Sequence, residues 1–312
     1  MEDLISIGAS ALRKAAVNKE AKDYLINHQE LFRLIKKAAD RYIGGECLEE
    51  TIVKARNART KGLKCSIEFM GENVKTPGEA MEATEEFVMI SGQLIAHQLP
   101  ATVSLDLSHI GLALSEDLCA LNLDKVCRAA AVAGVEVMIS AEGPEMTDAV
   151  LKMYKKMSRS HSHLGITLQA YLYRTKEDFD SLRSIPGRIR IVKGAFAASP
   201  GIAMERGGLL NETYLGYVDE LLSAGHKCSI ATHDHQIQQA VKNSIKTYNA
   251  VPGAYEFESL YGIQTEQLLA LHGEGHPARL YFVYGKEWYL YLCNRIAENP
   301  MNLFRAVADM VG

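Results

Sequence analysis

The chain has 312 residues and a net charge of −4 at pH 7, with lysine and arginine scattered along it. This balance argues against the basic surface of a nucleic-acid-binding protein. Hydrophobic residues make up 47% of the chain, enough for a large core, and no run of about 18 apolar residues predicts a transmembrane helix. The first residues lack the basic and apolar regions of a signal peptide, so we expect a cytoplasmic protein with at most peripheral membrane contact.

Six cysteines are spread over the chain without a CxxC pair. A chain of this length does not depend on disulfides, and the spacing is not that of a zinc ribbon or a redox dithiol. We therefore expect reduced, mostly buried thiols and no metal site.

The N-terminal part of the chain predicts helices. Apolar residues recur at helical spacing until Gly44-Gly45 ends the run. A further helix is predicted over 48–61, where basic residues gather toward the C-terminal end before Gly62. We predict that residues 1–62 form a helical arm.

From residue 63 onward, short apolar or β-branched runs alternate with longer helical patterns. The predicted strands are 64–69, 102–107, 135–141, 165–172, 188–193, 227–231, 253–257 and 279–284. Thr76-Pro77 begins one of the intervening helices, and Gly134 ends another. Eight strands alternating with helices predict an α/β fold, a closed (β/α)8 barrel over 63–312. A doubly wound sheet is disfavoured because no GxGxxG motif follows the first strand.

Active residues of such a barrel lie at the C-terminal ends of the strands and in the loops that follow. This rule selects polar residues near the predicted strand ends and two from the last helix: Asp106, Ser140, Glu142, Gln169, Arg190, Lys193, Thr232, His233, Asp234, Tyr281, Arg295 and Glu298.

Arg190 and Lys193 lie in a strand that helices should cover, so their charges must face the barrel interior or find a buried partner. One interpretation is an interior ion pair that only stabilises the fold. Another is a cationic lining for a phosphate or a reduced flavin. A third makes Lys193 a Schiff-base lysine. The spacing does not decide between them.

Gln169 lies in an apolar strand, where a buried amide needs partners for both its donor and its acceptor. A planar heterocycle or a neighbouring side chain would supply them. The run Thr232-His233-Asp234-His235 resembles a metal cluster, but adjacent residues at a strand end point to opposite sides. We therefore prefer a polar loop that contacts a ligand phosphate or ribose.

The final helix is predicted over 287–299 and places Tyr291, Arg295 and Glu298 on one face. That face carries an ordinary surface ion pair, or it closes over the barrel mouth and presents a guanidinium to a substrate carboxylate.

Six motifs follow one another along the chain: FMGEN (69–73), GITLQAYLYR (165–174), RIVKGAF (190–196), IATHD (230–234), FESLYG (257–262) and YLCNRIAEN (291–299). In this order they resemble the motif series of the proline dehydrogenase family, over roughly residues 30–300.

The resemblance implies a barrel that holds FAD non-covalently at its C-terminal face. This family takes a hydride from the carbon next to a ring nitrogen and passes the electrons to a quinone. The implied catalytic residues are Arg190, Asp106 and Ser140. The implied cofactor contacts are Ala141, Gln169, Arg190, Lys193, Gly194, Ala195, Thr232 and His233. The implied substrate contacts are Asp106, Phe196, Leu260, Tyr281, Tyr291, Asn294, Arg295 and Glu298.

Several positions depart from the family pattern. Asp106 stands where a lysine is usual, Ser140 where an aspartate is usual, and Asn294 where the first of two arginines is usual; Phe196 replaces a tyrosine. The first three changes lower the positive charge of the pocket by about two units. We therefore expect a substrate with less anionic character than proline, or an N-substituted or otherwise altered pyrrolidine.

Two other functions stay open. The changed residues also suit a flavin-binding protein without dehydrogenase activity, and Lys193 suits a Schiff-base lyase without FAD. A yellow flavin spectrum would exclude the lyase, and bleaching by cyclic amines would separate the other two.

Overall fold

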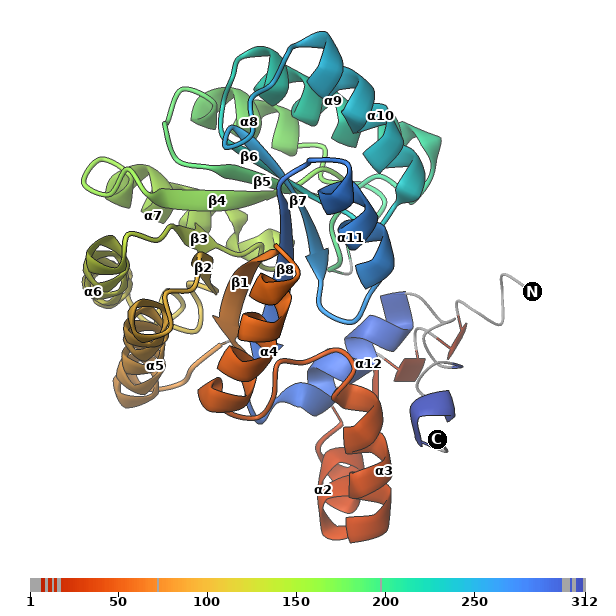
Figure 1. Cartoon of the computed structure of the whole chain (residues 1–312). Coiled ribbons are helices and arrows are strands. Elements are labelled where there is room, and N and C mark those ends of the chain that lie inside the picture. The colour runs from red at the N-terminus through yellow and green to blue at the C-terminus, as the bar shows by residue number, and fades with distance from the viewer. Residues whose placement is uncertain are drawn as a thin grey trace.

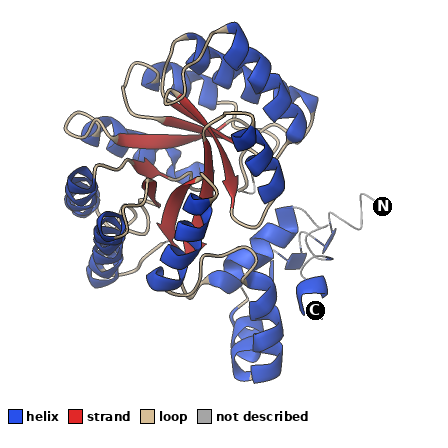
Figure 2. Ribbon diagram, in the orientation of Figure 1, coloured by secondary structure: helices blue, strands red, loops and turns tan. Residues whose placement is uncertain are grey.

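The computed structural model describes residues 7–8, 11–12, 14–15, 18–71, 73–196, 198–298, 304 and 307–310. Within these residues, eight parallel strands close into a barrel in the order β1 to β8, with β8 beside β1. Figure 1 shows the strands in the centre and the helices around them, and Figure 2 separates the two by colour. The predicted (β/α)8 barrel is confirmed.

The strands are β1 (Lys64–Phe69), β2 (Ala101–Leu105), β3 (Val137–Ile139), β4 (Leu164–Gln169), β5 (Ile189–Val192), β6 (Cys228–Ala231), β7 (Tyr255–Leu260) and β8 (Ala278–Tyr284). The α-helices are α2 (Lys19–Asn27), α3 (Gln29–Ala39), α4 (Leu48–Thr60), α5 (Pro77–Ala96), α6 (Glu116–Ala133), α7 (Thr147–Met157), α8 (Thr175–Leu182), α9 (Gly208–Ser223), α10 (His235–Thr247), α11 (Thr265–Gly273) and α12 (Trp288–Glu298). One 3-10 turn, η1, covers Pro144–Met146.

Local sequence explains several helix boundaries. Thr76 begins α5 with a capping box, in which its side chain accepts from the Glu79 backbone and the Glu79 carboxylate accepts from the Thr76 backbone. Pro77 occupies the first position, where no backbone donor is needed. Gly134 ends α6 at a φ of 66°, a left-handed conformation that glycine adopts without strain.

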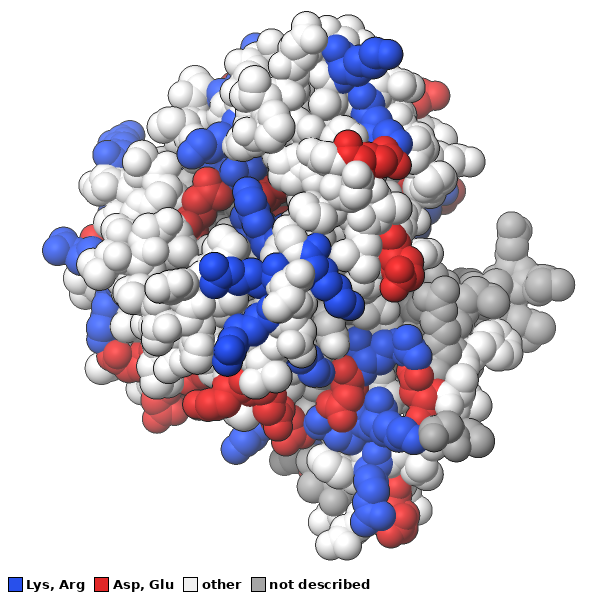
Figure 3. Space-filling view, viewed as in Figure 1, with Lys and Arg blue, Asp and Glu red and all other residues white. Residues whose placement is uncertain are grey.

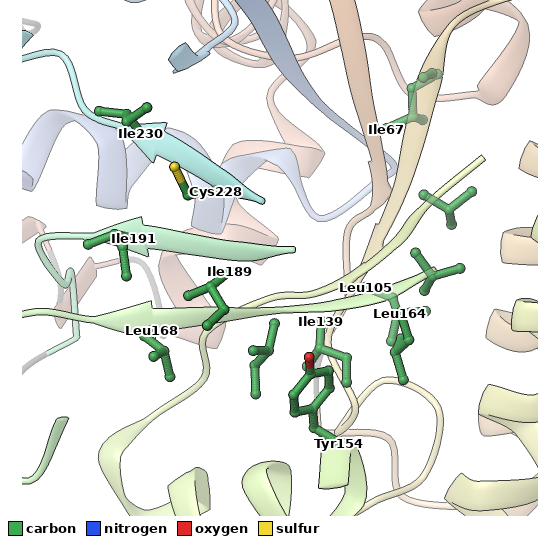
Figure 4. Close-up of a cluster of buried hydrophobic side chains, with 14 of the residues drawn as sticks. Ile67, Leu105, Ile139, Tyr154, Leu164, Leu168, Ile189, Ile191, Cys228 and Ile230 are labelled. Atoms are coloured by element: carbon green, nitrogen blue, oxygen red, sulfur yellow. The ribbon is translucent and has the colours of Figure 1, made fainter. Parts of the chain in front are cut away.

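The strands divide into an apolar outer face and a polar inner face. Outward-facing Leu105, Ile139, Ile166 and Leu168 are buried between the barrel and its helices. Figure 4 shows this layer beside Tyr154 of α7. Inward positions carry polar or charged side chains instead, among them Ser66, Ser104, Thr167, Arg190 and Glu258. The interior of this barrel is therefore held together by hydrogen bonds and ion pairs, whereas branched apolar side chains fill most such barrels.

A second group of charges lies toward the N-terminal ends of the strands. Arg279 binds Glu256 through two bonds, of 2.8 Å from Nε and 3.0 Å from Nη2. Arg188 donates from Nε to Glu136 at 2.8 Å. Burial acts to raise the pKa of Glu256, but the charges of Arg279 and Arg188 outweigh it and hold that pKa well below its usual range. These buried charges are tolerated because each has an opposite partner.

The helix after the last strand does not complete the ring. Instead α4 packs on β1 and β8, and its apolar residues Leu48, Ile52 and Ala55 belong to the main core. Helix α12 packs with α3 across a separate apolar cluster that also includes Val283 of β8. Figure 1 shows α12 beside the end of the barrel together with α3. The division into an arm over 1–62 and a barrel over 63–312 stays a prediction.

Most strand predictions agree with the structure within a few residues, but the seventh lies later than predicted. The strand expected over 253–257 is observed as Tyr255–Leu260. This shift brings Glu258 into the barrel wall with its side chain inward. In the described part of the chain, no helix is long and apolar enough to cross a membrane. Figure 3 shows acidic and basic side chains interspersed over one face of the molecule.

Candidate active site

The expected site residues do gather at one end of the barrel. Asp106 and Ser140 directly follow β2 and β3, Gln169 ends β4, and Lys193 directly follows β5. Thr232 and His233 follow β6. Because parallel strands all end at the same rim, these residues surround the barrel mouth.

Arg190 projects from β5 into the barrel and is almost fully buried. Its Nε donates to Thr167 Oγ1 at 2.8 Å, and Nη1 donates to Glu258 Oε1 at 3.1 Å. Nη2 donates to Ser140 Oγ at 3.3 Å, and the guanidinium carbon lies 4.9 Å from the centre of the Tyr281 ring. The interior ion pair considered from the sequence is therefore present, and the same guanidinium reaches the residues of the mouth.

Glu68 adds a carboxylate that the sequence analysis did not select. It belongs to β1, and its Oε2 accepts from Ser140 Oγ at 2.5 Å and from the Tyr281 hydroxyl. Burial raises the pKa of Glu68, and the two hydroxyl donors only partly oppose this. An acidic group is thus present next to residue 140, although it comes from the first strand. The sequence signal was a charged residue near the C-terminal end of the first strand, between Ile67 and Phe69.

Within the part of the chain that the structure describes, one of the two polar atoms of the Gln169 side-chain amide forms a hydrogen bond and the other does not. Its Nε2 donates to the backbone oxygen of Glu142 at 2.9 Å. Its Oε1 is buried and has no hydrogen-bond partner among the described residues. Gln169, Ala141 and Glu142 line a small cavity of about 30 Å³. A buried acceptor without a donor costs roughly 1–3 kcal/mol, so any donor that reaches this atom would recover that free energy.

Glu142 holds the loop after β3 in place. Its Oε1 accepts from the backbone nitrogens of Leu107 and Ser108, at 2.9 and 3.2 Å. These two bonds join the loop that carries Ser140 to the loop that carries Asp106. Asp106 itself is half-buried. The side chain of Glu142 therefore has a positioning role, whereas its backbone faces Gln169.

The segment after β5 approaches its neighbours closely. Lys193 Nζ donates to Asp234 Oδ2 at 2.8 Å, and Asp234 also caps α10 through the backbone nitrogen of Gln236 at 3.0 Å. Gly194 has a φ of 113°, and a Cβ there would lie 2.2 Å from the Tyr171 ring. Only glycine fits this position, whether or not a cofactor binds beside it.

His233 lies at the mouth as a neutral imidazole. Its Nε2 accepts from the backbone nitrogen of Leu260 at 3.0 Å, so the proton is on Nδ1. Burial, and next the charge of Arg295, lower the pKa of His233 to about 4. Because His233 and Asp234 are engaged in these other bonds, the run 232–235 does not form a metal cluster among the described residues.

Helix α12 lies against the mouth. Tyr291 of this helix packs on the same apolar cluster as Leu260 and Tyr281, which come from β7 and β8. The Arg295 guanidinium lies 5.0 Å from the Tyr291 ring centre, and its effect on the pKa of His233 places it near the end of β6. Tyr291 and Arg295 of this helix face therefore lie near the mouth, and the role expected for the face stays a prediction.

Four further positions gain less support. Asn294 is half-buried on α12, and the Glu298 side chain lies outside the described residues. Phe196 is 37% exposed in the loop after β5, where its backbone oxygen accepts from the Tyr171 hydroxyl at 3.2 Å. Ala195 precedes it in the same loop. The roles expected for these residues stay predictions.

Comparisons with known proteins agree with one another. A family model described as proline dehydrogenase matches residues 51–305. Proline dehydrogenase 2 of Bacillus subtilis is 32% identical, over 88% of this chain and 90% of that protein. Proline dehydrogenase of Deinococcus radiodurans is 29% identical, over 88% and 90%.

Solved structures show the same fold. Proline utilization A from Bdellovibrio bacteriovorus, inactivated by N-propargylglycine, aligns with a TM-score of 0.77 at 18% identity. The alignment covers 95% of this chain but only 41% of that longer protein.

The pKa of His233 predicts a pH dependence of stability. An unfolded histidine binds a proton below about pH 6.5, whereas folded His233 stays neutral to about pH 4. The unfolded state therefore gains protons first, and this residue's contribution to stability is lost as pH falls from 6.5 toward 4. We expect the free energy of unfolding of wild type to fall between pH 7 and pH 4.5 by about 2–3 kcal/mol more than that of His233→Gln, which keeps an acceptor for Leu260. Urea unfolding at the two pH values measures both.

The exposed His235 provides the matched control. His235→Gln should follow the wild-type profile. If the unfolding free energies of wild type and His233→Gln changed in parallel with pH, the His233 ring would not be held neutral in the folded protein.

Proposed function

Because the chain belongs to the proline dehydrogenase family, we propose that it oxidises the C–N bond of proline or a proline-like cyclic amine with FAD as its cofactor. We further propose a quinone or similar acceptor for the electrons. The family supports the reaction class, and the residues at the barrel mouth supply the support for the cofactor and for the details below.

The observation that carries the flavin proposal is the unsatisfied Oε1 of Gln169. A flavin ring presents an N–H donor between two carbonyls, which matches a buried acceptor of this kind. The other residues that we propose to hold FAD are Ala141, Arg190, Lys193, Gly194, Ala195, Thr232 and His233. When bound, FAD would accept the hydride and release two electrons to the next acceptor.

Arg190 would provide a fixed positive charge at this site. Thr167, Ser140 and Glu258 hold its guanidinium in place, so no reorganisation is needed when negative charge develops nearby. Glu258 offsets part of that charge, so the benefit is smaller than that of an isolated guanidinium. The ion pair found here and the proposed catalytic role are therefore compatible.

Glu68 is proposed to handle the proton of the amine. A bound secondary ammonium must lose one proton as its neighbouring carbon loses a hydride. The raised pKa of Glu68, caused by burial, lets its carboxylate take that proton more readily than an ordinary carboxylate does. Tyr281 and Ser140 orient this oxygen by donating to it.

The residues of the mouth favour a substrate with little negative charge. The resemblance to the family implies cations at the positions of Asp106 and Asn294, and Glu68 brings a further acidic group. Arg295 is proposed to meet the substrate from α12. We therefore propose a pyrrolidine without a carboxylate, or one altered at the nitrogen, in preference to plain proline.

The Schiff-base alternative has less support. Lys193 Nζ lies 2.8 Å from Asp234 Oδ2 in a salt bridge, so its amine is already engaged. A protonated amine cannot attack a carbonyl, so a lyase would first have to break this pair.

Replacement of Gln169 tests the cofactor site. We expect Gln169→Leu to weaken FAD binding by roughly 3- to 10-fold, the size of one lost neutral hydrogen bond. The measurement is a titration of apoprotein with FAD, followed by flavin fluorescence. Asn122→Leu is the control, because Asn122 is a buried amide on α6 that donates to the Ile110 backbone. If Gln169→Leu bound FAD as tightly as wild type, the proposed contact would not exist.

Restoring a cation at position 294 tests the substrate proposal. We expect Asn294→Arg to raise kcat/KM for L-proline by about 10- to 100-fold, because a charge-assisted bond to a carboxylate contributes about 1.5–3 kcal/mol. The kcat/KM for pyrrolidine, which has no carboxylate, should not rise. Asn243→Arg, on the exposed side of α10, is the control. A panel with hydroxyproline, N-methylproline and pipecolate completes the assay. A wild-type preference for L-proline over pyrrolidine, which lacks the carboxylate, would contradict the proposal.

A further inference from the structure

Three potential metal ligands meet at the end of the barrel away from the mouth. Cys127 lies on α6, and His161 and His163 lie in the segment between α7 and β4. One ligand atom from each lies within 4.8 Å of the others. Cys127 is fully buried, His161 is 8% exposed and His163 is half-buried. His163 directly precedes β4, which places the group at the N-terminal end of the strands.

Hydrogen bonds orient both imidazoles. His163 Nε2 lies 2.9 Å from the backbone oxygen of Cys127, which can only accept, so Nε2 carries the proton and Nδ1 the lone pair. His161 Nε2 lies 2.9 Å from Asp124 Oδ1. Metal-binding histidines typically donate their second nitrogen to a carbonyl or carboxylate in this way.

We infer that Cys127, His161 and His163 bind a divalent transition ion, with Zn²⁺ the best match. A thiolate and two imidazoles are the ligands that Zn²⁺ prefers, and a water would complete a tetrahedral site from the half-exposed side of His163. The thiol proton passes to solvent as the metal–sulfur bond forms.

The distances permit such a site with a small adjustment. Tetrahedral zinc with bonds of about 2.0–2.3 Å holds its ligand atoms roughly 3.3–3.8 Å apart. Atoms that lie up to 4.8 Å apart must therefore close by at most about 1–1.5 Å. Asp124 contributes negative charge next to the ion through His161, although its other oxygen also accepts from Arg128 Nε at 2.6 Å.

The position points to a structural role. The ion would join α6 to residues 158–163, two segments otherwise connected only through their packing and hydrogen bonds. The N-terminal end of such a barrel contributes to stability, whereas the opposite end carries the chemistry. This site shares no residue with the proposed dehydrogenase site, so an experiment that contradicts one proposal leaves the other unaffected.

Cobalt binding to the full-length protein tests the inference. A difference spectrum against the same sample before Co²⁺ cancels any bound chromophore. We expect wild type to show a thiolate-to-cobalt charge-transfer band that saturates at one ion per chain. Cys127→Ser should lose the band, whereas Cys119→Ser, which changes another fully buried thiol on α6, should keep it. A wild type without the band, or a band unchanged in Cys127→Ser, would overturn the inference.

A second pair of variants covers the case in which Cys127→Ser does not fold. His163→Gln should lose the cobalt band, whereas His226→Gln should keep it, because His226 occupies a similar loop before β6 and bonds to the Ile185 backbone. Zn²⁺ at 100 times its Kd should raise the Tm of wild type by about 5 °C and leave that of His163→Gln unchanged. Equal Tm shifts in both proteins would also contradict the inference.

Discussion

The Arg190–Glu258 ion pair determines how the barrel interior is built. A charge inside a closed parallel barrel must be paired and hydrogen-bonded. Here Glu258 of β7 also accepts from Ser66 of β1, and Arg190 of β5 donates to Thr167 of β4 and Ser140 beyond β3. One pair thus connects strands around most of the ring. Replacing either partner would leave the other charged and buried, which typically costs about 3–5 kcal/mol.

The same pair determines the chemistry available at the mouth. Because Arg190 bonds to Ser140 and contacts the Tyr281 ring, its charge reaches the group that includes Glu68. The mouth therefore contains Arg190 as a cation held by several hydrogen bonds, with Lys193 and Arg295 as further cations near acidic or neutral groups. In the proposed function, the charge of Arg190 stabilises the negative charge that develops on the cofactor, and the acidic groups favour a substrate of low negative charge.

Much of the fold was predictable from the sequence because its signals are local. The alternation of apolar runs and helical patterns, the capping box at Thr76 and the stop at Gly134 each depend on a few neighbouring residues. The pairing of Arg190 with Glu258 was not predictable, because the two residues lie 68 positions apart in the sequence. In addition, the strand predicted over 253–257 ends one residue before Glu258. Glu68 was missed for a similar reason: its partners come from β8 and the end of β3.

The candidate site shows the same division. Gln169 was recognised from a buried amide in an apolar strand, and the structure leaves its acceptor without a partner among the described residues. The group of Cys127, His161 and His163 has no compact motif, since its members come from a helix and a loop some 34–36 residues apart. The expectation of no metal site rested on spacing alone, and spacing does not show which distant segments meet.

The visible absorbance of the purified full-length chain tests the central claim most directly. With Gln169 and Arg190 at a flavin site, the protein should show a flavin spectrum after saturation with FAD and removal of the excess. Anaerobic addition of a cyclic secondary amine should bleach it. A protein that stays colourless, or a flavin that no amine of the panel reduces, would contradict the account.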